Sequence, residues 1–284
     1  MNIFAKLQNI DRRILYLLVA LVIIIPLVRR PAKHPHTIFK EVQNAYNTVQ
    51  AVPNDKLVIL SSYFDAGTVA ENGPQIEVMM RHLFRKGTKF AVITWDPVGA
   101  ELVSKIGKKI SKQMGKKYGR DWVDLGYNPG PVYVIISGMA KDFQSVIKQD
   151  KYGTKLADIP ATKNIKSAKQ IGAVVETTAS GTVPTWIAYF NMPNNIPLVY
   201  CPTAVMAAEA YPYLDSGQLK GMLNGVIGAA QYETLLGMGD KPTYSSAASW
   251  ALSTAHIFII VLLIIGNIGY FAANRAGRGG RRNG

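Results

Sequence analysis

Residues that commonly bind metals are scarce in this sequence. Its 284 residues include one cysteine, Cys201, and four histidines. A single cysteine cannot close an intramolecular disulfide and cannot form a CxxC or multi-cysteine zinc site. His34 and His36 lie beside one apolar segment, His256 lies in another, and His82 lies in a predicted helix, so a histidine site would need distant parts of the chain to meet. We therefore predict no metal and no cofactor, and a fold that is stabilised by packing.

The signature motifs of common enzyme classes are also missing. The sequence has no GxSxG elbow to expose a nucleophilic serine, no GxxxxGK[ST] loop to bind phosphates, no GxGxxG dinucleotide turn and no HExxH zinc helix. Each of these chemistries depends on its residue spacing, so the absence counts against the corresponding enzymes. We predict no catalytic residue and favour a protein that is not an enzyme.

Two apolar segments lie near the ends of the chain. Residues 14–28, ILYLLVALVIIIPLV, carry no charge and are bracketed by arginine pairs at 12–13 and 29–30. Residues 251–273, ALSTAHIFIIVLLIIGNIGYFAA, are long enough to cross a membrane. A cleaved signal peptide is the alternative for the first segment, but VRRPAKHP offers no small-x-small cleavage site. We predict two transmembrane helices and four regions: an anchor at 1–30, an α/β domain at 31–249, a second transmembrane helix at 250–274 and a basic tail at 275–284.

Basic residues near each span predict its orientation, because short cytoplasmic flanks collect lysine and arginine. The first span has three basic residues on each side, whereas the second is followed by four arginines and closely preceded only by Lys241. This asymmetry places both termini in the cytoplasm and the domain between the spans outside it. The arginines expected to face lipid are Arg12, Arg13, Arg275, Arg278, Arg281 and Arg282.

The formal net charge of +14 favours an anionic partner. Six lysines between Lys105 and Lys117 recur along one predicted helix, where a solvated face is the simplest explanation. The tail RAGRGGRR resembles segments that bind RNA, but directly after a span it is more simply a lipid-facing anchor. We predict membrane lipid as the anionic partner, rather than nucleic acid.

Between the apolar segments, short β-branched runs alternate with helical patterns. The runs that begin at Leu57 and Lys89 are each followed by a loop and an amphipathic helix, and VYVIISG, AVVETTAS and PLVYCPT continue the series as strands. Strands that alternate with helices are typical of a parallel sheet covered on both faces. We predict an α/β fold with a doubly wound, mostly parallel, Rossmann-like sheet, flanked by the two transmembrane helices.

Polar residues follow several of the predicted strands. In an open parallel sheet, ligands bind beyond the carboxyl ends of the strands, where the strand order reverses. Hydroxyl and carboxylate groups there could hold a small polar ligand or a cation, although Asp and Ser are also the ordinary residues of turns and helix caps. The residues expected to contact a ligand are Ser62, Asp65, Asp96 and Thr178.

Glycine and alanine recur at helical spacing in the last third of the chain. We predict a long helix from Gln218 to Leu236 whose glycine face packs either against the domain's own sheet or against another subunit. Further small faces lie at the start of the C-terminal span and within it. The positions predicted at interfaces are Gly217, Gly221, Gly225, Gly228, Ala247, Ala251, Ala255, Gly266 and Gly269.

Three segments carry a resemblance to known proteins: SSYFDAG, RHLFRKG and YPYLDSGQLKGMLNGVIGAAQYE. Through them the chain, from Asp11 to Leu236, resembles a family of bacterial membrane proteins with a span ahead of an α/β domain. The resemblance implies a bacterial cytoplasmic (inner) membrane. It implies no activity and no catalytic residue.

Three functions from different classes fit these patterns. We favour a structural or assembly subunit, in a homo-oligomer or a larger membrane complex, because small-residue surfaces are abundant and catalytic motifs are missing. A module that binds a small solute at the carboxyl edge of the sheet is the first alternative. A hydrolase-like enzyme that uses Asp65 or Asp96 is the second.

Overall fold

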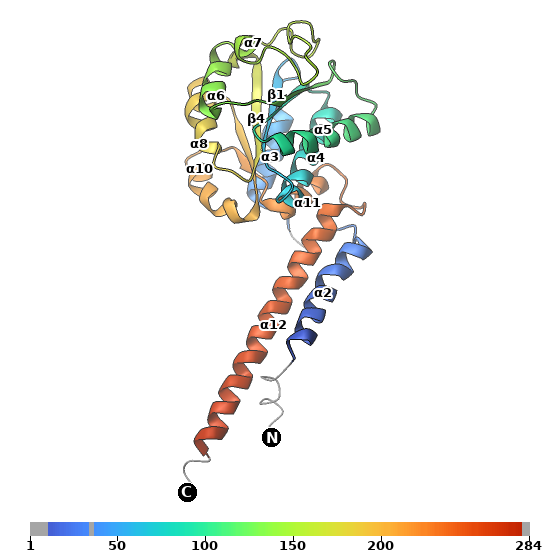
Figure 1. Cartoon of the computed structure of the whole chain (residues 1–284), viewed down its shortest axis with the longest axis vertical. Coiled ribbons are helices and arrows are strands. Elements are labelled where there is room, and N and C mark those ends of the chain that lie inside the picture. Colours follow the sequence, from blue (N-terminus) through green and yellow to red (C-terminus); the bar gives the residue numbers. More distant parts are fainter. Residues whose placement is uncertain (1–10, 34–36, 280–284) are drawn as a thin grey trace. The chain divides into compact units, whose positions relative to one another are not determined.

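A computed structural model describes residues 11–33 and 37–279 of the chain (Figure 1). These residues form two compact units: a helical unit, made of the residues up to 33 together with those from 240 onward, and an α/β unit of residues 37–239. The C-terminal helix begins at Tyr244, ahead of the predicted boundary at residue 250. The α/β unit contains the whole sheet, and with it all four predicted ligand residues.

The described part of the helical unit contains helices α2 (Arg12–Arg29) and α12 (Tyr244–Gly279). Polar side chains near the start of α12 donate hydrogen bonds to backbone carbonyls of the N-terminal segment. The Ser246 hydroxyl donates to the Pro31 carbonyl at 2.7 Å, and the Thr254 hydroxyl donates to the Val22 carbonyl at 3.1 Å. These bonds join the two segments within the unit.

Within residues 11–33 and 37–279, one helix is long and apolar enough to cross a membrane: the stretch Tyr244–Phe271 of α12. Large apolar side chains such as Ile257 and Leu263 are exposed along it. Helix α2 has 18 residues, but arginines occupy its first two positions and its last. The described residues therefore contain one candidate spanning helix where the sequence predicted two.

The small residues predicted at interfaces on α12 differ in burial. Ala247, Ala251 and Gly269 are buried, Ala255 is half-buried and Gly266 is exposed. A Cβ atom built on Gly266 meets nothing within 4 Å. Gly266 is thus a position on α12 where the described residues leave room for another helix.

The α/β unit is built on a six-stranded, all-parallel sheet in the order β3-β2-β1-β4-β5-β6. Its strands are β1 (Leu57–Tyr63), β2 (Phe90–Thr94), β3 (Trp122–Tyr127), β4 (Ile171–Thr178), β5 (Leu198–Pro202) and β6 (Gly221–Met222). Nearly all strand residues are buried, as expected for a parallel sheet that helices cover on both faces. The predicted Rossmann-like α/β fold is confirmed, and the strand order reverses between β1 and β4.

Helices cover the two faces of the sheet in separate layers (Figure 1). One layer contains α3 (Lys40–Ala51), α4 (Val69–Lys86), α5 (Pro97–Gln113) and α11 (Gly225–Leu235). The other contains α6 (Val132–Lys141), α7 (Phe143–Val146), η2 (Ala168–Gln170), α8 (Val183–Trp186), the π-helical segment η3 (Ile187–Asn191), α9 (Met192–Asn194), η4 (Ala204–Ala210) and α10 (Tyr211–Asp215). Successive strand residues point alternately into two apolar cores, one beneath each layer.

The run VYVIISG forms a helix, α6, and the predicted strand is wrong. Pro131 before it has an extended backbone, and the helix buries Ile136 and Met139. A spacing of three residues places both side chains on one helical face. A short apolar run is compatible with a strand or a helix, and here the burial of one helical face decides between them.

The predicted glycine-faced helix from Gln218 to Leu236 forms only from Gly225 onward, and its first part is wrong. Gly221 lies in β6, and helix α11 begins only at Gly225. A Cβ atom at Gly221 would overlap the backbone of Ala45 in α3, and one at Gly228 would lie 2.6 Å from backbone that precedes α11. At both positions the missing side chain allows another backbone segment of the domain to pack closely. A continuous glycine face for another subunit therefore does not form, and Gly217 lies in a turn with a φ of +74°.

Candidate functional site

The strand order creates a crevice at the carboxyl edge of the sheet. The chain proceeds from β1 to β2 on one side and from β4 to β5 on the other, so the loops after β1 and β4 diverge. A crevice of about 210 Å³ lies between these loops, and we term it the switch-point crevice. Its lining residues are Tyr63, Phe64, Asp65, Thr68, Asp96, Ala179 and Ser180.

Two carboxylates reach the crevice because each belongs to a local turn. Asp65 accepts the Gly67 N–H at 2.8 Å directly after β1, and Asp96 accepts the Gly99 N–H at 2.7 Å as the N-cap of α5. A Cβ atom at Gly99 would overlap the Phe64 carbonyl oxygen, so glycine is needed where the start of α5 approaches the loop after β1. Gly99 thus helps to bring both carboxylates to one crevice.

The crevice carries negative charge, in contrast to the chain as a whole. The formal net charge of the protein is +14, yet the crevice has no lysine, arginine or histidine among the described residues that line it. Thr68 and Asp96 begin helices α4 and α5, and each helix terminus contributes about +0.5 of a charge, against −2 for the two carboxylates. The balance is about −1, so the crevice favours a cation.

The structure divides the four predicted ligand residues into two pairs. Asp65 and Asp96 line the crevice, whereas Ser62 and Thr178 are fully buried beneath it and do not line it. The Thr178 hydroxyl donates to the last carbonyl of β1 at 3.1 Å and accepts the Ser180 N–H at 2.8 Å. Thr178 therefore holds the loop after β4 in place, and its contact with a ligand stays a prediction.

Three hydroxyl oxygens around the strand ends are buried and have no hydrogen-bond partner in the described part of the chain. They belong to Ser62, Thr68 and Thr94. Ser62 and Thr94 are neighbours in the β1–β2 register, and Thr68 lines the crevice. Most buried polar groups have a partner, and the exceptions require an explanation. These hydroxyls add a second polar feature to the edge that carries the two carboxylates.

A buried glutamate, Glu176 of β4, lies beneath the crevice. It is fully buried, and burial raises its pKa to about 7. Thr182 donates a hydrogen bond to its Oε1 atom, and Ser61 and Trp186 also approach the carboxyl group. Its Oε2 atom has no hydrogen-bond partner among residues 11–33 and 37–279. The sequence signal for it, one glutamate in the otherwise uncharged strand IGAVVETT, was missed because it belongs to no catalytic motif.

Comparisons of the chain with protein-family models, with curated proteins and with solved structures found no match. The resemblance to bacterial membrane proteins therefore rests on three sequence segments alone. The function of the α/β unit has to be inferred from the geometry and charge of its own residues.

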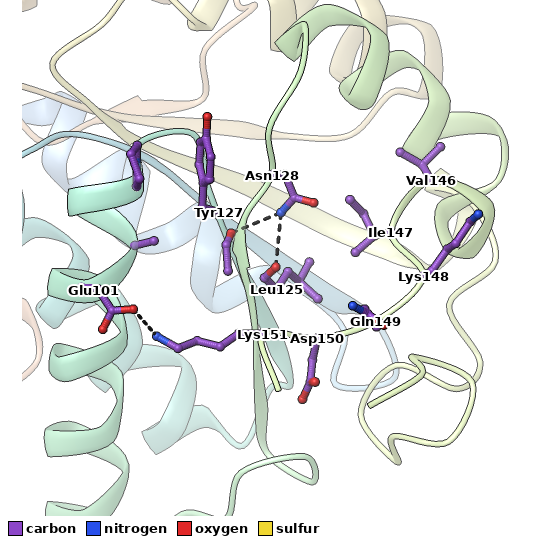
Figure 2. A pocket seen from close by; sticks show the side chains of 13 residues that line it. Glu101, Leu125, Tyr127, Asn128, Val146, Ile147, Lys148, Gln149, Asp150 and Lys151 are labelled. Atoms are coloured by element: carbon purple, nitrogen blue, oxygen red, sulfur yellow. Dashed lines mark hydrogen bonds and ion pairs between the residues drawn. The ribbon is translucent and has the colours of Figure 1, made fainter. Parts of the chain in front are cut away.

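A larger hollow, of about 620 Å³, lies at the end of β3 beside the first turns of α5, and the sequence did not predict it. Figure 2 shows the Lys151 ammonium group reaching the Glu101 carboxylate, at 3.0 Å. Asp150 accepts the backbone N–H groups of Tyr152 and Thr154 at 2.9 and 2.8 Å. Lys148 also lines the hollow, so its two lysines and two carboxylates sum to a formal charge of zero. The hollow therefore offers a cation less net negative charge than the smaller crevice does.

Proposed function

We propose that the protein is a membrane-anchored binding module whose α/β unit holds a small organic cation in the switch-point crevice. The observation that supports this function is the pair of carboxylates, Asp65 and Asp96, in a crevice whose described lining contains no basic residue, on a chain of net charge +14. Folds of this class bind ligands where the strand order reverses. We place binding ahead of assembly because Gly221 and Gly228 pack against the domain's own backbone.

The size and the polar groups of the crevice define the class of ligand. A volume of about 210 Å³ is smaller than the roughly 300–1,000 Å³ of pockets for drug-sized ligands, so the ligand has few heavy atoms. In the described residues, no group of three or more His, Cys, Asp or Glu side chains could hold a metal ion. An ammonium group suits the crevice because it can donate to the carboxylates and to the hydroxyl of Ser180.

Isothermal titration calorimetry of the full chain in detergent tests this function with three probes of similar length: putrescine, 1,4-butanediol and succinate. We expect putrescine to bind, and the neutral and dianionic probes to bind at least about tenfold more weakly, because only the diamine supplies positive charge. Asp65→Asn and Asp96→Asn should each weaken putrescine binding by about tenfold. Asparagine preserves the turn and cap hydrogen bonds, so these variants remove charge and keep the local geometry.

The matched control is Asp215→Asn, which removes an exposed carboxylate from α10 and should leave the affinity unchanged. Equal affinity for all three probes, or an equal loss in the control, would contradict the proposal. Binding that depends on Glu101 instead would place the ligand in the larger hollow.

We also propose that α2 and α12 both cross a bacterial inner membrane, with both termini in the cytoplasm. The stretch Tyr244–Phe271 supports one span. The arginines at the two ends of α2 support the other, because long basic side chains can extend to the headgroups on either side of a short span. Of the arginines expected to meet lipid, Arg12 and Arg13 begin α2, Arg275 and Arg278 belong to α12, and Arg281 and Arg282 lie outside the described residues.

An impermeant thiol reagent applied to intact cells tests this orientation. Asn164→Cys, at an exposed position of the α/β unit, should react, and Asn283→Cys should not. Cys201 is buried and should contribute little background. The reverse labelling pattern would contradict the orientation.

Assembly into a homo-oligomer or a larger membrane complex is a second candidate function, supported by the open position at Gly266. Glycine lets another helix approach closely within a membrane. If assembly uses this face, Gly266→Leu should lower the mass of the detergent-solubilised particle. A monomeric wild-type particle would contradict assembly.

A further inference from the structure

Glu176 is joined to the switch-point crevice by the loop that follows β4. The Thr182 hydroxyl donates to Glu176, and the Thr182 N–H donates to the Ser180 carbonyl at 3.0 Å. The Ser180 N–H in turn donates to the Thr178 hydroxyl at 2.8 Å. Because Ser180 lines the crevice, the buried carboxyl group and the crevice share one short, hydrogen-bonded segment.

The strand register also places Glu176 near the crevice. It pairs with Ser61 in the β1–β4 register, two residues before the pair formed by Tyr63 and Thr178. Two residues of a strand span about 7 Å. A positive charge in the crevice is therefore close enough to affect the ionisation of this carboxyl group.

We propose that Glu176 is a proton site linked to the switch-point crevice, and that it releases its proton when a cationic ligand binds there. This inference rests on the proposed function. Ionisation makes the carboxylate a stronger acceptor for Thr182 and for the buried indole N–H of Trp186, which has no hydrogen-bond partner in the described residues. The cation and the ionised carboxylate therefore stabilise the same arrangement of the loop.

Among the groups around Glu176 with a shifted pKa, its own carboxyl group is the one that titrates near neutral pH. The groups around it are Ser61, Trp95, Thr182, Trp186, Tyr200 and Cys201, with Glu209 acting on Tyr200 and with Asp65 and Asp96 in the crevice. Burial, and then the nearby Glu176 charge, raise the pKa of Tyr200, and burial is also the main cause of the raised pKa of Cys201. Both groups are therefore neutral at pH 7, whereas the pKa of Glu176 is about 7.

Calorimetry of putrescine binding in two buffers of different ionisation enthalpy counts the protons that the full-length protein releases. At pH 7 we expect net release of part of a proton, and an affinity that rises by about tenfold between pH 6 and pH 8. Glu176→Gln keeps an acceptor oxygen but cannot ionise, so its proton count should fall to zero and its affinity should not vary with pH. Asp215→Asn, at an exposed position in α10, should retain both the proton release and the pH dependence of the affinity.

Tryptophan fluorescence gives a second readout that needs no ligand. Trp186 approaches Glu176, and Trp95, whose ring centroid is 6.4 Å from that of Trp186, donates a hydrogen bond to Ser61, the β1 neighbour of Glu176. The wild type should show a pH transition with a midpoint of about 7, which putrescine moves to lower pH and which Glu176→Gln lacks.

The two readouts separate this inference from the function on which it rests. Putrescine binding without proton release, and without a fluorescence transition, overturns the linkage and leaves the proposed function standing. A fluorescence transition without putrescine binding overturns the proposed function, and the linkage with it. If Glu176→Gln does not fold, the number of protons that the wild type releases on binding putrescine still tests the linkage, and zero release overturns it.

Discussion

Two buried clusters in the α/β unit surround His82 and Glu176, and they differ in how completely these two side chains are hydrogen-bonded. The His82 Nδ1 atom of α4 lies 2.7 Å from the Tyr232 hydroxyl, and its Nε2 atom lies 2.8 Å from Gln50 Oε1. Glu176 has a partner for Oε1 but, in the described part of the chain, none for Oε2. A fully satisfied polar network stabilises a fold, whereas a buried group without a partner requires another explanation.

The two clusters also differ in their position relative to the crevice and in the charge state of their central side chain. His82 stacks on Tyr46, with ring centroids 4.8 Å apart, and lines neither the crevice nor the larger hollow. Burial, and then Lys86 and Arg85, lower its pKa to about 4, so its ring is neutral at pH 7. We infer that the His82 cluster is structural and that the Glu176 cluster is linked to the ligand.

The largest expected effect is on the pH dependence of stability, which should differ in sign between the clusters. The pKa of His82 is 6.5 unfolded and about 4 folded, so the unfolded chain binds the extra proton and stability falls as pH decreases between these values. The pKa of Glu176 is 4.5 unfolded and about 7 folded, so the folded chain binds the extra proton and stability falls as pH increases between these values. In the wild type the two effects oppose each other where their ranges overlap.

Removing either titratable group should make the contribution of the other to the pH dependence of stability measurable. In Glu176→Gln the free energy of unfolding should rise by roughly 3 kcal/mol from pH 4 to pH 6.5, and in His82→Phe it should fall by a similar amount from pH 4.5 to pH 7. Guanidinium unfolding of the full chain in detergent, followed by circular dichroism, measures both slopes. Slopes of the same sign in the two variants would contradict the opposite pH dependence that we assign to His82 and Glu176.

At a constant pH of 7, His82→Phe should lower the free energy of unfolding by about 2 kcal/mol, because phenylalanine preserves the ring but leaves the buried Tyr232 hydroxyl without its partner. His256→Phe in α12 is the control and should change stability little. Putrescine affinity should be the same in His82→Phe and in the wild type. A loss of binding would show that the His82 cluster is not purely structural.

The contrast between the clusters also shows what the sequence could predict. The parallel sheet was predictable because β-branched runs alternate with amphipathic helices, and the placement of Asp65 and Asp96 followed from the rule that parallel strands end at one edge. Both residues occupy loops whose geometry is set within a few residues of the strand.

Other features depend on contacts between distant segments. Nothing local to VYVIISG indicates that its Ile136 and Met139 pack on one helical face, and nothing local to Gly221 indicates that α3 lies against it. The environment of Glu176 is assembled from β1, β5 and the segment after β4. A sequence pattern therefore indicates a lone glutamate but not its burial.

A smaller effect is expected where the crevice is formed. Gly99→Ala should lower the free energy of unfolding by about 1–2 kcal/mol and weaken putrescine binding, because the added methyl group moves the start of α5, and Asp96 with it, away from the Phe64 carbonyl. Gly181→Ala is the matched control, since a Cβ atom there meets nothing within 4 Å. Thermal unfolding and calorimetry measure the two effects, and unchanged binding in Gly99→Ala would count against this account of the crevice.

The smallest expected effect comes from one hydrogen bond to Glu176. Thr182→Val removes a donor to the carboxylate, so the pKa of Glu176 should rise and the fluorescence midpoint should move to higher pH, with a loss of stability of about 1 kcal/mol. Thr185→Val, at a half-buried position on α8, should leave the midpoint unchanged. An equal change in both variants would mean that the Thr182 bond does not control Glu176.

The central claim is that a small cation binds between Asp65 and Asp96, and a crystal structure of the full chain grown with putrescine tests it most directly. Our account predicts electron density for the diamine in the switch-point crevice, with an ammonium group within hydrogen-bonding distance of both carboxylates. Density for putrescine in the larger hollow beside Glu101, with none in the crevice, would contradict it.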